Sequence, residues 1–235
     1  MSKTEISNQL YTAFLNDLKA KNEVEKLKIA AIDTSNWVKE YGTGGVNYAT
    51  YYHNHASYAN FPVVNISKAG AELYCAWLTE KLNAENVGLQ FTVRLPVEAE
   101  WLRACNPNNN EFPYSWEGPY LRGEKGEVLC NFRRIGAENI YYDSLTQSFQ
   151  LKEIVPQKTK ESAYSELLAP VNSYFPTTLG LYNLNGNVAE FIAEGFAMGG
   201  SWRSAGYDVR NESKLNITHS STEVGFRPVF SVRAK

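Results

Sequence analysis

Cysteine is scarce in this sequence, and its placement limits thiol and disulfide chemistry. Three cysteines occur in 235 residues, and none follows Cys130. Three thiols cannot all pair with one another. Cys75 falls within a helical pattern and is predicted to be a buried thiol. For Cys105 and Cys130 the sequence leaves both a disulfide and two free thiols open.

Histidine is equally scarce, with only His53, His55 and His219. The spacing of His53 and His55 could place two imidazoles on one face of a strand, as a pair of metal ligands requires. No third ligand lies nearby in the sequence. We therefore interpret this pair as solvated side chains of a polar, aromatic loop.

The sequence also lacks an excess of either charge and any long apolar run. Its 23 basic and 25 acidic residues give a net charge of −2, so nothing favours nucleic acid or a membrane surface as a partner. No apolar run is long enough to span a bilayer. Met1 leads directly into SKTEISN, which has none of the features of a signal peptide.

Aromatic residues, by contrast, are abundant. The chain holds 15 tyrosines, 11 phenylalanines and five tryptophans, and 43% of its residues are hydrophobic. That content is enough for one domain with a sizeable core, and large rings can pin irregular segments in a loop-rich domain. Since we find no repeat, linker or low-complexity tract, we interpret residues 1–235 as one domain.

Only a few segments have the periodicity of helices or strands. Ser7 is a suitable N-cap for the first helix and Ser67 for a later one, and Pro96 suits the first turn of a third. The predicted helices cover residues 8–19, 68–82 and 96–104, with a weaker one over 22–31, and the predicted strands cover 61–66 and 90–94. Glycine, asparagine and serine punctuate other segments, so loops are predicted over residues 33–37, 43–58 and most of 111–176.

The rest of the chain is organised around residues 180–227. This stretch contains GLYNLNGNVAEF, then GGSW, then a polar segment, then GFRPVFSV. Asparagine and glycine tolerate a left-handed backbone, which lets consecutive carbonyls converge. Converging carbonyls beside one carboxylate suit a hard cation such as calcium. The alternative is a tight Asn/Gly turn that enters a strand or helix and holds no ion.

These motifs, together with three earlier segments, resemble the formylglycine-generating-enzyme (sulfatase-modifying factor) family. The earlier segments are TEISNQLYTAFL, FPVVNISKAGAELYCAWL and RLPVEAEWLRAC, so the resemblance covers nearly the whole chain. It implies an α+β fold of the formylglycine-generating-enzyme type, related to C-type lectin folds, with little regular secondary structure. It also implies a strand ahead of KTEISN, so we expect native residues before Met1 to be missing.

The enzymes of this family oxidise a substrate cysteine with a pair of thiols that follow GGSW or GGSY and hold copper(I). Here Ser204 stands where the first thiol is expected, and Val209 and its preceding residues supply no second one. A hydroxyl is a poor copper(I) ligand and cannot perform thiol chemistry. We therefore expect no copper, and the comparison leans against an enzyme.

The resemblance implies a structural calcium ion at the GLYNLNGNVAEF motif. By the family's pattern, its ligands here are the Asn183 side chain, the backbone carbonyls of Gly186 and Val188, and the Glu190 carboxylate. Calcium accepts six to eight oxygens, so water or a nearby loop must complete the shell. If the ion binds only the folded chain, chelation is expected to lower the melting temperature.

The residues after GGSW occupy the place that lines the family's substrate cleft. By that match the candidate binding residues are Trp202, Arg203, Tyr207 and Arg210, because arginine and aromatic side chains make good binding surfaces. The alternative is that Trp202 belongs to the core and that the others are ordinary surface residues.

Three segments carry a narrower resemblance, to the sulfatase-modifying-factor-type lipoproteins of gliding, type IX-secreting bacteria. They are IAAIDTSNW, YATYYHNHASYANFPVVNIS and NGNVAEFIAEGFAMGGSW. The resemblance implies a non-catalytic structural or binding module of the bacterial cell envelope that assembles with a protein partner. It also implies a location in the periplasm or outer membrane, with a lipid anchor ahead of Met1, although a cytoplasmic location stays open.

Two other functions remain open at this point. One is an enzyme of the formylglycine-generating and sulfoxide-synthase superfamily with altered chemistry, although the iron-binding helical domain of the sulfoxide synthases is absent here. The other is a ligand-binding receptor domain of the C-type lectin kind, to which the Asn, Tyr, Asp and Ser residues between GGSW and GFR would contribute.

Overall fold

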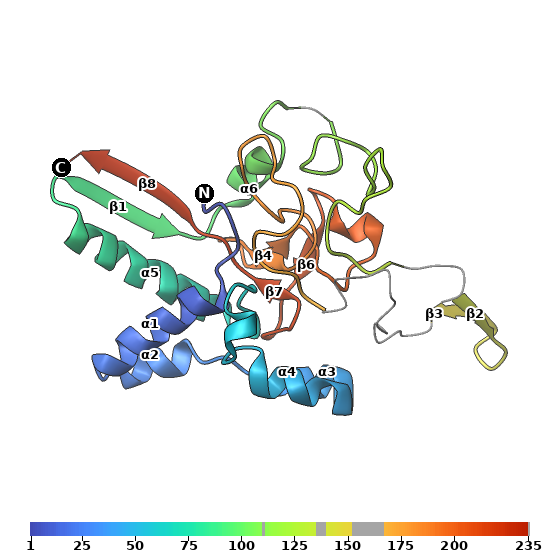
Figure 1. Cartoon of the computed structure of the whole chain (residues 1–235), viewed down its shortest axis with the longest axis horizontal. Coiled ribbons are helices and arrows are strands. Elements are labelled where there is room, and N and C mark those ends of the chain that lie inside the picture. Colours follow the sequence, from blue (N-terminus) through green and yellow to red (C-terminus); the bar gives the residue numbers. More distant parts are fainter. Residues whose placement is uncertain (110, 135–139, 152–166, 235) are drawn as a thin grey trace.

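The structure, a computed structural model, describes residues 1–109, 111–134, 140–151 and 167–234. Short helices and short strands alternate with long irregular connections (Figure 1), and this mixture confirms the predicted α+β class. The helices are α1 (Asn8–Ala20), α2 (Val24–Ile29), α3 (Ser35–Tyr41), α4 (Val46–Tyr51), α5 (Lys68–Glu85) and α6 (Glu98–Cys105), with 3-10 turns η1 (Gly42–Gly45), η2 (Ala56–Tyr58) and η4 (Gly206–Val209). The strands are β1 (Leu89–Arg94), β2 (Ile140–Asp143), β3 (Ser148–Leu151), β4 (Ala189–Phe191), β5 (Phe196–Met198), β6 (Lys214–Asn216), β7 (Val224–Gly225) and β8 (Val229–Ala234).

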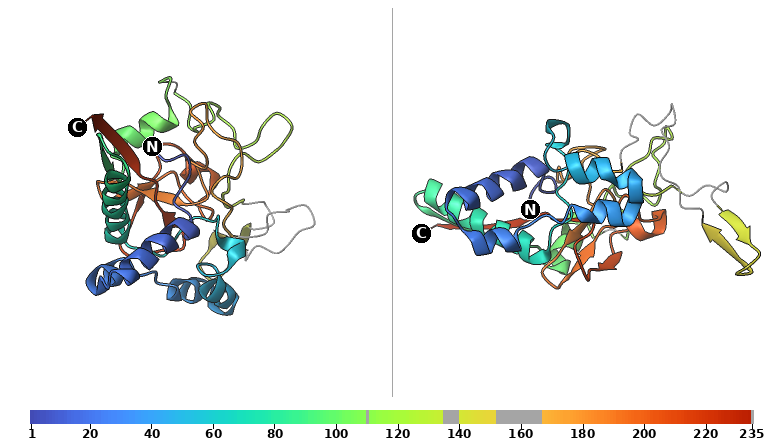
Figure 2. Two further views of the ribbon diagram at one scale, coloured as in Figure 1. Left: turned by 60° about the vertical axis from the view of Figure 1, so that its left-hand side comes forward. Right: turned by 90° about the horizontal axis from the view of Figure 1, so that it is seen from below.

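The strands of the described residues form three small sheets. A four-stranded sheet has the order β6-β5-β4-β7, in which only the β4–β7 pair is parallel. The antiparallel ribbons β1–β8 and β2–β3 complete the set. In Figure 1 the four-stranded sheet lies in the centre, the β1–β8 ribbon runs beside α5 on one side, and the β2–β3 hairpin stands away on the other. The right-hand view of Figure 2 shows the same hairpin clear of the body.

The two predicted N-caps are confirmed. The Ser7 hydroxyl accepts the backbone N–H of Leu10 at 3.3 Å at the start of α1. The Ser67 hydroxyl accepts that of Gly70 at 3.0 Å at the start of α5. Each cap satisfies one of the N–H groups that a helix leaves without an internal partner.

Aromatic rings join α1 and α5 to the GFR segment. Tyr11 and Phe14 of α1 pack against Tyr74 of α5, with ring centroids 5.9 and 5.5 Å away. Tyr74 in turn contacts Phe226 at 5.3 Å. All four rings are buried, and burial of large rings is the main apolar contribution to a core of this kind. This cluster therefore holds the start of GFR in place from the helical side.

The outer edge of β1 is closed by side chains of α5 instead of by another strand. The Asn83 amide donates to the Phe91 carbonyl at 2.9 Å and accepts the Phe91 N–H at 2.7 Å. One turn earlier, the Thr79 hydroxyl accepts the Val93 N–H at 2.9 Å. These bonds replace the ladder that an edge strand would otherwise offer to another chain.

Two predictions of local structure are wrong. The segment 61–66 is not a strand, because its backbone bonds to separate segments: Val63 N–H donates to the Ile6 carbonyl, and Asn65 N–H to the Ser221 carbonyl. Asn65 also has a φ of 61°, which interrupts an extended strand. Much of the predicted loop over 33–37 and 43–58 is helical, in α3, η1, α4 and η2.

No helix in the described part of the chain is long and apolar enough to cross a membrane.

Candidate functional site

The GLYNLNGNVAEF motif forms the tight turn that its composition predicts. Asn183, Gly186 and Asn187 have φ angles of 51°, 75° and 62°. A Cβ added to Gly186 would lie 2.3 Å from the carbonyl oxygen of Asn131. The residue at this position must therefore be a glycine both for its backbone conformation and for the close approach of the neighbouring loop.

Amide side chains of the turn connect it to several irregular segments. The Asn187 amide accepts the Ala169 N–H at 2.8 Å and donates to the Glu5 carboxylate at 2.8 Å. Asn185 accepts the Ser115 N–H and donates to the Val209 carbonyl, both at 2.8 Å. Because buried backbone groups need partners, these two asparagines stabilise loops that have no sheet to pair with.

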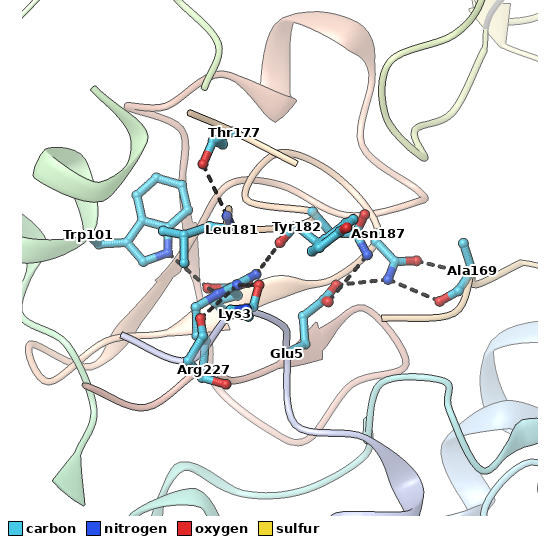
Figure 3. A network of polar contacts seen from close by, with 12 residues as sticks. Lys3, Glu5, Trp101, Ala169, Thr177, Leu181, Tyr182, Asn187 and Arg227 are labelled. Atoms are coloured by element: carbon cyan, nitrogen blue, oxygen red, sulfur yellow. Dashed lines mark hydrogen bonds and ion pairs between the residues drawn. The ribbon is translucent and has the colours of Figure 1, made fainter. Parts of the chain in front are cut away.

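The Glu190 carboxylate belongs to a buried ion pair. Arg227 reaches it with Nε at 3.0 Å and Nη2 at 2.7 Å, and the Trp101 indole donates to it at 3.0 Å (Figure 3). The remaining donors of Arg227 bond the backbone carbonyls of Ser2, Lys3 and Tyr182. Both charged side chains have no exposed surface. Arg227 thus joins the N-terminal segment, the loop before the turn, and β4.

The predicted calcium ligands differ in how free they are to bind an ion. Asn183 Oδ1 is buried and has no partner among the described residues, so it could accept a cation. Both oxygens of Glu190, however, accept N–H groups, and one donor carries a full positive charge. A calcium ion at this carboxylate would have to displace Arg227 or be repelled by it. Arg227 thus already balances the charge of Glu190. A calcium ion held by Asn183, Glu190 and the Gly186 and Val188 carbonyls stays a prediction, which chelation tests.

Chelation is accordingly expected to leave the melting temperature unchanged. The Arg227–Glu190 pair already neutralises the charge that calcium would have balanced. The test is thermal unfolding of the whole chain in calcium and in EGTA. As a control, Glu190→Gln should lower the melting temperature equally in both buffers. A melting temperature several degrees higher in calcium would restore the family's calcium site.

A second carboxylate lies beside this pair. Glu5 is fully buried and accepts bonds from the amides of Asn187, at 2.8 Å, and Asn183, at 3.3 Å. Burial raises its pKa to about 8, and the neighbouring Glu190 adds to that rise, while Arg227 and the Asn187 bond oppose it. Glu5 is therefore a buried acid that holds its proton well above the usual range.

The backbone of the GGSW motif also lies very close to neighbouring segments. Gly199 and Gly200 have φ angles of 88° and 65°. A Cβ on Gly199 would lie 2.3 Å from the Leu184 carbonyl oxygen, and one on Gly200 would lie 2.3 Å from that of Asp208. The two glycines therefore bring the segment after GGSW against the GLYNLNGNVAEF turn.

Two of the four predicted binding residues lie away from the cavity that the others line. Trp202 is only 7% exposed, contacts the Tyr41 ring, and donates its indole N–H to the Thr222 carbonyl at 3.2 Å. It is a core residue, so its assignment to a binding surface is wrong. The Arg203 guanidinium lies over the Tyr41 ring and near Glu40. It holds α3 against the GGSW segment.

Tyr207 and Arg210 do line a large cavity between α6 and residues 204–215. Its volume is about 1220 Å³, and Arg103, Phe112 and Lys214 also line it. The Arg210 guanidinium carbon lies 3.3 Å from the centre of the Tyr207 ring, and Tyr207 is 73% exposed. The stack presents a rigid, flat surface at the cavity. Sequence reasoning missed the contributions of α6 and Phe112, since only the fold places them beside the GGSW segment.

Ser204 and Val209 stand at the positions where the family's enzymes have their two thiols. Ser204 lines the cavity, and its hydroxyl accepts the Ser201 N–H at 2.9 Å. Val209 is fully buried beside Cys130, whose thiol is buried and has its pKa raised to about 12 by that burial. A protonated, enclosed thiol is a poor copper ligand. The site therefore offers no pair of thiolates.

The remaining cysteines and the histidine pair are also structural. Cys75 and Cys105 are buried and, like Cys130, free. Of the two alternatives left open for Cys105 and Cys130, the structure has the free thiols. His53 is buried and bonds Asn8 through Nδ1 at 2.9 Å, whereas His55 is exposed at the start of η2. The interpretation of both imidazoles as solvated is therefore wrong for His53. Burial lowers the pKa of His53 to about 3.

The sequence is similar to a known protein family and to a characterised enzyme. The family model described as "Sulfatase-modifying factor enzyme 1-like domain" matches residues 1–232. The formylglycine-generating enzyme of Thermomonospora curvata is 27% identical over 166 residues, which are 71% of this chain and 42% of that protein. The match thus spans less than half of this relative's length.

Solved structures similar to this one come from several proteins. PvdO from Pseudomonas aeruginosa has a TM-score of 0.49 and 18% identity, with 75% of this chain and 63% of that chain covered. Variable protein 1 of Treponema denticola has a TM-score of 0.48 and 15% identity, with 77% of this chain and 74% of that chain covered.

Proposed function

This chain belongs to the sulfatase-modifying factor enzyme 1-like domain family, and we propose that it is a binding module without the family's copper-dependent oxidation. One observation carries the proposal. The cavity beside GGSW has an exposed Tyr207–Arg210 stack at its wall and Ser204 where a thiol would be needed. The arrangement provides surface for recognition and lacks the ligands for copper(I).

The composition of the cavity favours a polypeptide ligand. Its walls carry the cations of Arg103, Arg210 and Lys214 and the carboxylates of Glu111, Asp208 and Glu212, with several asparagine amides between them. Equal numbers of opposite charges do not select a polyanion. They suit a protein segment whose backbone and mixed side chains can bond with both.

We further propose that the module works in the bacterial cell envelope, in the periplasm or outer membrane. The support is the narrower resemblance of IAAIDTSNW and its two companion segments to the lipoproteins of gliding, type IX-secreting bacteria. In this proposal the ligand of the cavity is a protein partner in an envelope complex, and a lipid anchor ahead of Met1 would hold the domain at the membrane.

The proposal is tested by presenting the purified chain with a random peptide library and, separately, with a glycan array. Selected peptides that bind wild type support the polypeptide reading. Binding to glycans alone would favour the lectin-type receptor. A lack of selective binding in both assays would overturn the binding module.

Binding of selected peptides is expected to fall at least tenfold in the double variant Tyr207→Ala with Arg210→Ala. Its melting temperature should stay close to that of wild type, because Tyr207 is mostly exposed and substitutions of this kind rarely change stability much. Arg203→Ala is the matched control. It removes a neighbouring arginine that faces Glu40 and Glu223, so peptide affinity should be kept. Peptide affinity is measured by fluorescence anisotropy. An equal loss of affinity in the double variant and in Arg203→Ala would show that the peptide binds elsewhere.

The chain is expected to produce no formylglycine from a cysteine-containing sulfatase peptide. The reason is the absence of a thiol at Ser204 and Val209. The measurement is mass spectrometry of the peptide after incubation with copper and oxygen, with the Thermomonospora curvata enzyme as the positive control. Peptide aldehyde above the background without protein would favour the enzymatic alternative.

A further inference from the structure

The β2–β3 hairpin has a structure suited to contact with another molecule. Its strands pair in register from Ile140 opposite Leu151 to Asp143 opposite Ser148. In Figure 1 and in the right-hand view of Figure 2 the hairpin stands away from the body of the described chain. Opposite residues of an antiparallel pair share a face and neighbours alternate, so the register divides the hairpin into two distinct faces.

One face is apolar and exposed. It carries Ile140, Tyr142 and Phe149, whose side chains are 49%, 56% and 74% exposed. Tyr142 and Phe149 lie opposite each other and meet edge to face, with ring centroids 5.4 Å apart. These residues run along both strands, so the apolar surface is a continuous strip.

The other face carries one exposed ring, that of Tyr141, and is otherwise made of polar side chains that bond with one another and with the turn. The Asp143 carboxylate accepts the Thr146 hydroxyl at 3.0 Å, and Gln150 donates to the Ser148 hydroxyl at 2.8 Å. These bonds satisfy the polar face without help from outside. Within the part of the chain that the structure describes, the apolar face is exposed. An exposed strip of rings is stabilised only when another apolar surface covers it.

We infer that the face of Ile140, Tyr142 and Phe149 is a docking surface for an apolar surface of a partner protein. A two-stranded hairpin is at best marginally stable alone, and a covering layer stabilises it. The partner supplies that layer by packing on the rings, which are the side chains that contribute most at protein interfaces. This surface is separate from the cavity at Tyr207 and does not depend on the function proposed for it.

The charge of the hairpin favours a protein over a nucleic acid or an anionic membrane. Asp143 is the only charged residue in the segment 140–151. Phosphates and acidic lipid headgroups are bound through lysine and arginine, which the hairpin lacks. A neutral, ring-lined strip fits the neutral apolar core of a protein interface.

The test uses p-benzoylphenylalanine in place of Phe149 in the full chain, made in its own host and irradiated there. In a matched second chain the photoreactive residue replaces Tyr141, which is 50% exposed but lies on the polar face. We expect one discrete protein adduct from position 149 and none from position 141. The adduct's protein, identified by mass spectrometry, is then purified and titrated against the unlabelled chain.

Affinity for that purified protein is expected to fall at least tenfold in Tyr142→Ser with Phe149→Ser. Tyr142→Phe, which keeps the ring, and Tyr141→Ser, on the polar face, should both bind as wild type does. No adduct at position 149, equal adducts at both positions, or no loss of affinity in the double variant would overturn the inference. So would an adduct to a second copy of this chain, or binding to phosphatidylcholine vesicles that the double variant loses.

Discussion

Replacing Arg227 by methionine is expected to lower the free energy of unfolding by about 3–5 kcal/mol, which is the usual cost of breaking a buried ion pair. The substitution leaves the Glu190 carboxylate charged, enclosed and without its bonds at 2.7 and 3.0 Å. It also removes donors from the backbone carbonyls of Ser2, Lys3 and Tyr182. The change would be measured as a lower urea midpoint at constant slope.

Arg94→Met is the matched control for this prediction. Arg94 also forms a two-bond pair with a glutamate, Glu100, at 2.7 Å for each bond. That pair is exposed, with 43% and 39% of the two side chains accessible, and exposed pairs contribute about 0–1 kcal/mol. Similar losses in the two variants would show that the buried pair does not hold the organising stretch together.

A double variant distinguishes two causes of the lost stability: the unpaired charge of Glu190 and the lost backbone contacts of Arg227. Glu190→Leu with Arg227→Met removes both charges, so it leaves no uncompensated ion in the core. It should be more stable than Arg227→Met alone, although the Trp101 indole loses its acceptor. A double variant less stable than both single variants would mean that Arg227 acts mainly through its backbone contacts.

The turn at the centre of the site could be predicted from the sequence, but its charged partner could not. Asparagine and glycine at 183, 186 and 187 predict a left-handed backbone, and those residues adopt it. Glu190 and Arg227 lie 37 residues apart, so their contact depends on how β4 and the GFR segment come together. The family pattern assigned Glu190 to a cation, and the guanidinium of Arg227 is the cation it contacts.

The sequence also could not predict which residues after GGSW are exposed and which are buried. Tyr207 and Arg210 line the cavity as expected, whereas Trp202 belongs to the buried cluster that contains Trp37 and Tyr52. An aromatic residue suits a core and a binding surface equally well. Only the packing of α3 and α4 against the GGSW segment decides between them.

Local signals predicted α1, α2, α5 and α6 but missed α3 and α4. α1 and α5 have serine caps and apolar faces, and β1 has strand-like residues, so all three were predicted near their observed bounds. The α3–α4 segment has glycines and few caps, and its helices are stabilised by ring packing. Trp37 stacks on Tyr48 at 4.9 Å and contacts Tyr52 at 5.2 Å. Tertiary burial thus outweighs weak local propensity there.

The second large effect concerns pH, and it follows from Glu5. Its pKa rises from a usual value of 4.5 to about 8 in the folded chain, chiefly because burial disfavours the carboxylate. The protonated folded form is therefore fully stabilised below the unfolded pKa. As pH rises above about 4.5 the unfolded chain releases this proton while the folded chain retains it, so stability falls until the pH passes about 8. The slope contributed by this one group is at most about 1.4 kcal/mol per pH unit.

Glu5→Gln is expected to flatten the decline in unfolding free energy between pH 5 and pH 8, because glutamine has no proton to release. Its side chain can still accept the Asn187 amide, which donates to Glu5 at 2.8 Å. Glu100→Gln is the control, since its bonds from Arg94 lower the pKa of Glu100 to about 2, outside this window. Urea unfolding at several pH values gives the three slopes. If wild type and Glu5→Gln lose stability in parallel as pH rises, Glu5 is ionised in the folded chain, and the charge of Arg227 is shared between two carboxylates.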